Sequence, residues 1–310
     1  MKQAQFPNET GTKGEFRRQS SAFREWVRAD GSTDFPADSG RYHLYVSSAC
    51  PWAHRAIIAR RLKGLEEAIG MTIVDPLRDD RGWKFTDEAD PLHGFEFLAE
   101  AYRASDPKFE GRVTVPVLWD KQTNRIVNNE SSEILRMLNR EFDAFGDATV
   151  DLYPEGLRAE IDRLNERIYN TVNNGVYRSG FAATQEAYEE AVLPLFETLD
   201  YLEDLLSKNR FLVGDKITEA DWRLFTTLIR FDAVYHGHFK CNIRRIVDYP
   251  NLWGYLRELY QQPGVAETVN FDHIKRHYYM THLALNPTGI VPSGPAIQFD
   301  EPHERGGGSQ

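Results

Sequence analysis

The most constraining feature of this sequence is a change of periodicity near residue 145. Residues 41–140 alternate between β-rich and helical segments, whereas residues 155–282 show helical periodicity throughout. A chain of 310 residues is long enough for two domains. We therefore predict an arm over 1–40, an α/β domain over 41–145, and an all-α domain with a C-terminal tail over 146–310.

The α/β part has the order β-α-β, a long insertion, and then β-β-α. In chain order we expect strand 41–47, helix 51–64, strand 68–74, the insertion 75–112, a hairpin of 115–119 and 125–128, and helix 131–140. In the all-α part we expect helices over 156–173, over 184–206, from 218 onward and near 251–260. Thr218 and Asp221 are spaced as in a capping box.

Composition and charge exclude several classes of protein. The net charge is −10, and a nucleic-acid binder usually carries a basic surplus. No apolar run approaches the length of a membrane span, and the N-terminal residues lack the apolar core of a signal peptide. Two cysteines cannot form a disulfide framework or a cysteine-rich zinc site. We expect a cytoplasmic protein that binds no metal, membrane or nucleic acid.

The strongest local motif is SSACPW at residues 47–52, where Cys50 follows a strand and precedes a helix that opens with proline. The first N–H groups of a helix have no intrahelical partner, and together with the helix dipole they stabilise an anion. A cysteine in this place is favoured as a thiolate nucleophile. Cys241 stands alone and is interpreted as structural.

Two further motifs could contribute to a ligand site, and the second suits an amino-acid head group that carries both charges. Proline cannot donate to a sheet, so in TVPV the residue Pro116 belongs at a strand start, and Val115 before it would expose its backbone groups. In NESS, Glu130 could pair with an ammonium group, and Ser131 begins a helix whose N-terminus could hold a carboxylate.

The order of these three motifs resembles the glutathione transferase superfamily, in which a thioredoxin-like α/β domain precedes an all-α domain. The resemblance covers about residues 41–282. It implies that Pro116 is cis and that the backbone of Val115 pairs with the cysteinyl part of glutathione. It further implies that Glu130 and Ser131 hold the γ-glutamyl end, and that residues 218–221 form a structural cap.

Several separate blocks look like the glutathionyl-hydroquinone reductases, which form the Xi class of the superfamily. The blocks are SSACPWAHRA, RGWKF, VTVPVLWD, NNESSEILRMLN, NNGVYRSGF and NPTGIVPSGP. This resemblance implies a homodimer that reduces S-glutathionyl hydroquinones with glutathione as co-substrate and Cys50 as nucleophile. By the same resemblance, Trp83 would stack over glutathione, Phe85 and Arg112 would also belong to the glutathione site, and the catalytic tyrosines Tyr177, Tyr235 and Tyr278 would line the quinol pocket.

Other functions remain open at this stage. An omega-like thioltransferase or dehydroascorbate reductase would use the same cysteine with a different acceptor pocket. A conjugating transferase would instead activate glutathione with a serine or tyrosine such as Ser47, Ser48 or Tyr45. A third possibility is a non-catalytic interaction module with the same fold, which the presence of every motif of the site disfavours.

Overall fold

A computed structural model describes residues 9–86 and 89–305. The described chain forms two compact units. Unit 1 comprises Gln19–Asp151 and Glu267–Val291, and unit 2 comprises residues 9–18, Leu152–Ala266 and residues 292–305. Each unit groups segments that are distant in the chain, whereas the domains expected over 1–40, 41–145 and 146–310 follow chain order. The bounds of those expected domains stay a proposal.

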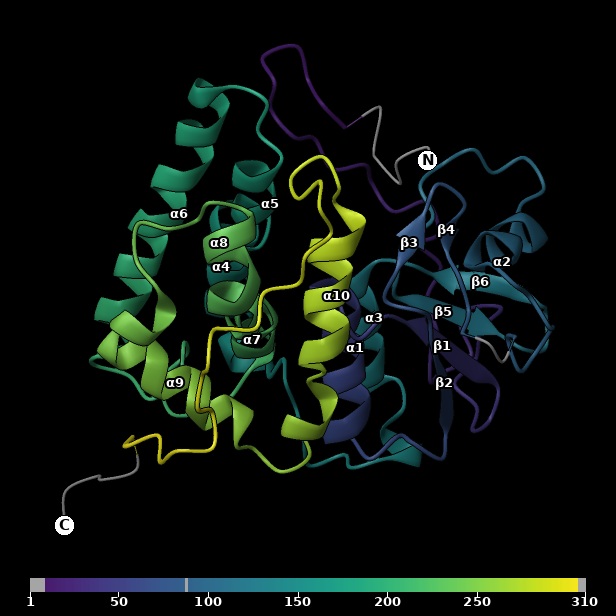
Figure 1. Ribbon diagram of the computed structural model, residues 1–310. Coiled ribbons are helices and arrows are strands. Elements are labelled where there is room, and N and C mark those ends of the chain that lie inside the picture. The colour runs from purple at the N-terminus through teal and green to yellow at the C-terminus, as the bar shows by residue number, and fades with distance from the viewer. Residues whose placement is uncertain (1–8, 87–88, 306–310) are drawn as a thin grey trace. The chain divides into compact units, whose positions relative to one another are not determined.

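Unit 1 is built on a four-stranded mixed sheet. Its strands are β1 (Tyr42–Val46), β2 (Ile69–Ile73), β5 (Val117–Asp120) and β6 (Arg125–Asn128), in the order β2-β1-β5-β6. Strands β1 and β2 are parallel, and the other neighbours are antiparallel. Helices α1 (Pro51–Leu62) and α3 (Ser131–Arg140) lie on one side of the sheet and α2 (Leu98–Ser105) on the other (Figure 1). The expected thioredoxin-like α/β fold is confirmed.

The insertion contains structure that the sequence interpretation missed. It holds the short strands β3 (Arg78–Asp79) and β4 (Gly82–Trp83) and the whole of α2. The N-cap of α2 is Phe97, which is not a typical capping residue. Instead, Oε1 of Glu100 accepts hydrogen bonds from the backbone N–H groups of Glu96 and Phe97 at 2.9 and 2.8 Å. A short helix without a recognisable N-cap carries little local signal, so the sequence indicated only an insertion here.

The arm covers the edge of strand β6. The N–H of Glu25 donates to the carbonyl of Val127 at 3.0 Å, and the N–H of Asn129 donates to the carbonyl of Phe23 at 3.1 Å. The ring of Phe23 also packs against Tyr102, 5.6 Å away between centroids. Pairing satisfies backbone groups that an open sheet edge would leave exposed.

Unit 2 is almost entirely helical, as expected. Its helices are α4 (Arg158–Ile168), α5 (Gly175–Gly180), α6 (Gln185–Leu206), α7 (Glu219–Arg230), α8 (His236–His238) and α9 (Pro250–Tyr260). Single π-helical turns at Tyr169–Asn173 and Phe231–Tyr235 continue α4 and α7. Short 3₁₀ turns of this unit lie at Glu155–Leu157 and Ile246–Asp248. A further 3₁₀ turn at Asp143–Phe145 and helix α10 (Phe271–Thr281) belong to unit 1, and the turn at Ala266–Thr268 lies where the chain passes from unit 2 to unit 1. None of the helices among the described residues is long and apolar enough to span a bilayer.

The expected capping box at the start of α7 is confirmed. Oδ2 of Asp221 accepts hydrogen bonds from the backbone N–H and the hydroxyl of Thr218, at 2.7 and 3.1 Å. Oδ1 of the same carboxyl accepts from the hydroxyl of Tyr255 at 2.9 Å. Burial raises the pKa of Asp221, although these hydrogen bonds act in the opposite direction. The residue is therefore structural.

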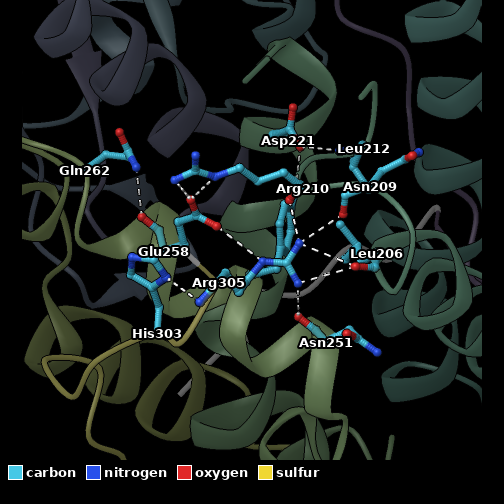
Figure 2. Close-up of polar contacts among 11 residues, drawn as sticks. Leu206, Asn209, Arg210, Leu212, Asp221, Asn251, Glu258, Gln262, His303 and Arg305 are labelled. Carbon is cyan, nitrogen blue, oxygen red and sulfur yellow. Dashed lines mark hydrogen bonds and ion pairs between the residues drawn. The ribbon is translucent and has the colours of Figure 1, made fainter. Parts of the chain in front are cut away.

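The C-terminal tail is fastened within unit 2 by Arg305 (Figure 2). Nη2 of Arg305 donates to the carbonyls of Asn209 and Arg210 at 3.1 and 2.6 Å, and Nη1 donates to the carbonyl of Asn251 at 3.2 Å. Nε donates to Oε2 of Glu258, which is almost fully buried. Because carbonyls just beyond a helix C-terminus lack intrahelical donors, the guanidinium satisfies groups that follow α6.

Candidate active site

Cys50 occupies the N-cap position of α1 and is partly exposed. It has extended backbone angles (φ −81°, ψ 122°), and the N–H of His54 donates to its carbonyl at 3.0 Å. The first turn of α1 contains no acidic residue, and no side chain caps it. The positive end of the dipole of α1 therefore lies next to the thiol.

The segment before β5 lies against the thiol of Cys50. The Val115–Pro116 peptide is cis, as the resemblance implied. Strand β5 starts at Val117, two residues later than expected, and its ladder with β1 ends at the pair Tyr45–Val117. The backbone of Val115 is therefore outside the sheet, and Sγ of Cys50 donates to its carbonyl at 3.6 Å.

Glu130 is the N-cap of α3, which begins at Ser131 as expected. Oε1 of Glu130 accepts from the backbone N–H and hydroxyl of Ser132 at 3.1 and 2.9 Å, and Oε2 accepts from the hydroxyl of Ser21 at 3.0 Å. Burial alone would raise the pKa of Glu130. The hydrogen bonds from Ser132 and Ser21 and the nearby charge of Arg55 outweigh burial and hold that pKa below its ordinary value of 4.5. Glu130 is thus a carboxylate at neutral pH.

Arg55 and Ser21 join this cluster without having been assigned to it from the sequence. Arg55 is buried, its Nη1 lies 3.4 Å from Oγ of Ser131, and its guanidinium lies 4.5 Å from the ring centre of Trp52. Ser21 is 109 residues before Glu130, and no sequence motif marks it. Only the pairing of the arm with β6 brings it there.

Trp83 is buried on strand β4, and its ring is stacked on His277 with 5.0 Å between centroids and 18° between planes. Its Nε1 has no hydrogen-bond partner among the described residues. Phe85 is also buried and packs on Tyr45 at 5.4 Å, so it belongs to the core of unit 1. Arg112 is half-buried, three residues before Val115.

The three predicted tyrosines are divided between the two units. In unit 2, Tyr177 and Tyr235 lie 6.0 Å apart between ring centroids. The guanidinium of Arg18 lies 5.0 Å from the Tyr177 ring, and Tyr235 is fully buried. In unit 1, the buried Tyr278 packs against His282 at 5.5 Å. The roles of all three tyrosines stay predictions.

Tyr45 and Ser47 are poorly suited to activating glutathione. Tyr45 is fully buried, and its hydroxyl donates to Oδ1 of Asp90 at 2.9 Å. Burial, together with the charge of Asp90, raises the pKa of this phenol. Ser47 is fully buried, and its Oγ accepts from the N–H of Ala49 at 3.2 Å. These contacts disfavour a conjugating transferase that relies on either hydroxyl.

A thioredoxin-like unit with a cysteine at the first helix, a cis-proline and an acidic cap, accompanied by a helical unit, defines a glutathione transferase. Two family models match the chain: the glutathione S-transferase N-terminal domain over residues 49–141 and the C-terminal domain over residues 185–258. The chain belongs to the glutathione transferase superfamily.

Its relatives place it within the Xi class. It is 55% identical to the glutathionyl-hydroquinone reductase YqjG of Escherichia coli over 95% of this chain and 93% of that protein. It is also 55% identical to the glutathionyl-hydroquinone reductase PcpF of Sphingobium chlorophenolicum, covering 91% and 90%. The Xi-class transferase of Natrialba magadii superimposes with a TM-score of 0.90 at 52% identity, covering 94% and 95% of the two chains.

Proposed function

We propose that this protein reduces S-glutathionyl hydroquinones to hydroquinones, with glutathione as co-substrate. The observation that carries the proposal is the partly exposed thiol of Cys50 at a helix N-terminus, 3.6 Å from the carbonyl of Val115. A thiol in this place can attack the sulfur atom of a ligand that pairs with the backbone of Val115. The glutathionyl-hydroquinone reductases YqjG and PcpF, each 55% identical to this chain, support the choice of substrate.

The glutathionyl group is bound through its backbone and its charged ends. The cysteinyl part pairs with the backbone of Val115 beside Pro116. The ammonium group pairs with Glu130, which is ionised at neutral pH, and the γ-glutamyl carboxylate binds at Ser131, where α3 begins. Trp83 contributes the N–H of its indole, and Arg112 adds positive charge. Phe85 supports this region from the core. A glutathione-bound structure of YqjG is consistent with a glutathione site on this fold.

The reaction proceeds in two steps. The Cys50 thiolate attacks the sulfur of the substrate, and the bond between that sulfur and the aromatic carbon breaks. The bonding electrons pass to the ring carbon, which takes a proton, so the hydroquinone leaves and Cys50 is joined to glutathione in a mixed disulfide. A second glutathione thiolate then attacks the glutathionyl sulfur, which releases oxidised glutathione and the Cys50 thiolate.

The tyrosine hydroxyls of Tyr177, Tyr235 and Tyr278 serve the first step. They donate hydrogen bonds to the quinol oxygens and supply the proton that the ring carbon takes. A keto tautomer of the quinol, in which that carbon already holds the proton, makes the step easier, because the electrons of the broken carbon–sulfur bond then pass into the ring and its carbonyl group. The second cysteine is not the resolving thiol. Cys241 is fully buried, and burial raises its pKa to about 12. The resolving thiol therefore comes from glutathione, and the kinetics are ping-pong.

We also propose a cytoplasmic homodimer.

Intact-protein mass spectrometry tests the chemistry directly. After exposure to a glutathionyl hydroquinone, the protein is expected to gain one glutathionyl group, mapped to Cys50 by peptide analysis and removed by added glutathione. Cys241→Ser is the matched control and should form the same adduct. No adduct, or an adduct on Cys241, contradicts the proposal.

The thioltransferase and dehydroascorbate reductase alternatives use the same mixed disulfide. These alternatives differ from the proposal in the substrate that the enzyme reduces. Turnover of a glutathionyl hydroquinone should exceed turnover of a small mixed disulfide or of dehydroascorbate at equal concentrations. The reverse ranking would favour the alternative.

A further inference from the structure

We propose that His277 is a positioning residue that holds Trp83 in the orientation needed to bind glutathione. The proposal rests on the proposed function, because it gives Trp83 a role at the glutathione site. His277 is buried on α10 and contacts two residues of the insertion, Pro76 and Trp83. Its Nδ1 lies 2.7 Å from the carbonyl oxygen of Pro76, and its ring is stacked on the indole of Trp83.

The hydrogen bond to Pro76 determines which nitrogen of the imidazole carries a proton and how the ring is oriented. A carbonyl oxygen only accepts, so Nδ1 carries a proton and donates it. The orientation of the ring is then fixed at its edge by this hydrogen bond and at its face by the stack on Trp83. The same side chain thus contacts Pro76, two residues before β3, and Trp83, the last residue of β4.

The hairpin needs such a support. Strands β3 and β4 have two residues each, and their ladder is Arg78–Trp83 and Asp79–Gly82. A two-residue ladder is too short to be stable by itself. The guanidinium of Arg78 also lies 5.5 Å from the Trp83 ring. The stack on His277 adds a contact across the face of the indole, whose Nε1 is buried without a partner among the described residues.

Helix α10 is itself joined to the helix that carries the nucleophile. Nε2 of His54, on α1, lies 2.8 Å from Oγ1 of Thr268, which precedes α10. His277 is followed by Tyr278, a residue of the proposed quinol site. Cys50, Trp83 and Tyr278 are therefore linked through α1 and α10 within unit 1, and His277 is the link to Trp83.

This arrangement predicts a specific kinetic signature. His277→Ala should raise the KM for the glutathionyl hydroquinone, whose glutathionyl group binds beside Trp83, about fivefold to tenfold, while kcat changes less than twofold. His277→Asn retains a donor but not the stack, and His277→Phe retains a ring but not the donor. Each should show a smaller rise in KM than the alanine variant.

A double-mutant cycle separates positioning from general destabilisation. If His277 acts through Trp83, His277→Ala should have no further effect on the KM for the glutathionyl hydroquinone in a Trp83→Phe background. His43→Gln is the control, since His43 is another buried histidine of unit 1, with Nε2 2.8 Å from Oγ1 of Thr72. It should lower the midpoint of unfolding without moving that KM. Additive effects of the two substitutions, or an unchanged KM in a folded His277→Ala protein, would overturn the proposal.

Failure of the proposed function can be told apart from failure of this inference. Glutathione binding to the Cys50→Ser protein is measured by calorimetry, with and without His277→Ala. If glutathione binds and His277→Ala weakens binding about fivefold to tenfold, His277 positions Trp83 even when the hydroquinone is not a substrate. If glutathione binds equally well to both proteins, the inference is wrong whether or not the hydroquinone is reduced. If glutathione does not bind to the folded protein, the proposed function and this inference both fail.

Discussion

The Sγ atom of Cys50 lies 3.6 Å from the carbonyl oxygen of Val115, although 65 residues separate them in the chain. One belongs to the start of α1 and the other to the segment just before β5. A peptide-like ligand that pairs with the backbone of Val115 has its side chain next to the thiol. This relationship is the physical basis of the sulfur-to-sulfur transfer that we propose at Cys50.

The two cysteines should differ sharply in reactivity. Cys50 is partly exposed, whereas Cys241 is fully buried, and burial raises the pKa of its thiol to about 12. Iodoacetamide at neutral pH should therefore alkylate one thiol per native chain, and peptide mapping should assign it to Cys50. Both thiols should react in denaturant. Alkylation of Cys241 in the native protein would contradict this prediction.

Replacing Glu130 by Gln should weaken glutathione binding about tenfold to a hundredfold, because an ammonium group loses a charged partner. Ser21→Ala removes only the hydroxyl that donates to Oε2 of Glu130, so its effect should be about twofold to fivefold. Calorimetric titration of both variants measures these changes. Equal affinities for the wild type and Glu130→Gln would exclude a charge role for this carboxyl.

The pH dependence of binding gives a second check on Glu130. Its pKa lies below the ordinary value of 4.5, so the group stays ionised throughout pH 5–8. The affinity for glutathione should show no loss from protonation of this carboxyl above about pH 5 and should fall at lower pH. A transition centred near neutral pH that disappears in Glu130→Gln would show that this carboxyl is protonated there.

Conversion of Tyr235 to Phe keeps a buried ring and removes one hydroxyl. If that hydroxyl assists proton transfer to the quinol, single-turnover formation of the mixed disulfide should slow about tenfold to a hundredfold. Reaction of the preformed mixed disulfide with glutathione should be unchanged. Rapid-quench kinetics of the two half-reactions measures both, and equal slowing of both steps would point to a purely structural role.

The tail contact of Arg305 should contribute to the stability of unit 2. Arg305→Ala leaves several backbone carbonyls and Glu258 with fewer donors, so the free energy of unfolding should fall by about 1–3 kcal/mol. Arg245→Ala is the control, since its ion pair with Asp248 is solvent-exposed, and it should have little effect. Urea denaturation followed by circular dichroism measures both. Equal losses would show that the tail contact adds nothing specific.

Two buried histidines should make the protein less stable in mild acid. Burial lowers the pKa of His43 and of His238 to about 4, whereas an unfolded histidine titrates near 6.5. Between these values the unfolded chain binds more protons, so each histidine contributes stability that is present above pH 6.5 and lost as pH falls towards 4. The loss is about 1–3 kcal/mol for each. His43→Gln should make the dependence of unfolding free energy on pH shallower, and an unchanged slope would contradict the assignment.

The sequence by itself determined the features that depend on local patterns. Strand and helix periodicities placed β1, α1, β2, β6, α3 and most of unit 2 within a few residues. The capping box of Thr218 and Asp221 is a three-residue spacing and was visible in the same way. The position of Cys50 at the start of α1 was predicted because a strand, this cysteine and a proline follow one another closely in the sequence.

Tertiary structure decided what depends on distant partners. Helix α2 has no typical N-cap residue, and its buried face became evident only in the fold. Ser21 and Glu130 meet because the arm pairs with β6, and His277 and Trp83 meet because α10 returns to unit 1 after most of the helical chain. The physical reason is that local periodicity records which face of a segment is buried. Which distant side chains share that buried space is set by the packing of the whole chain.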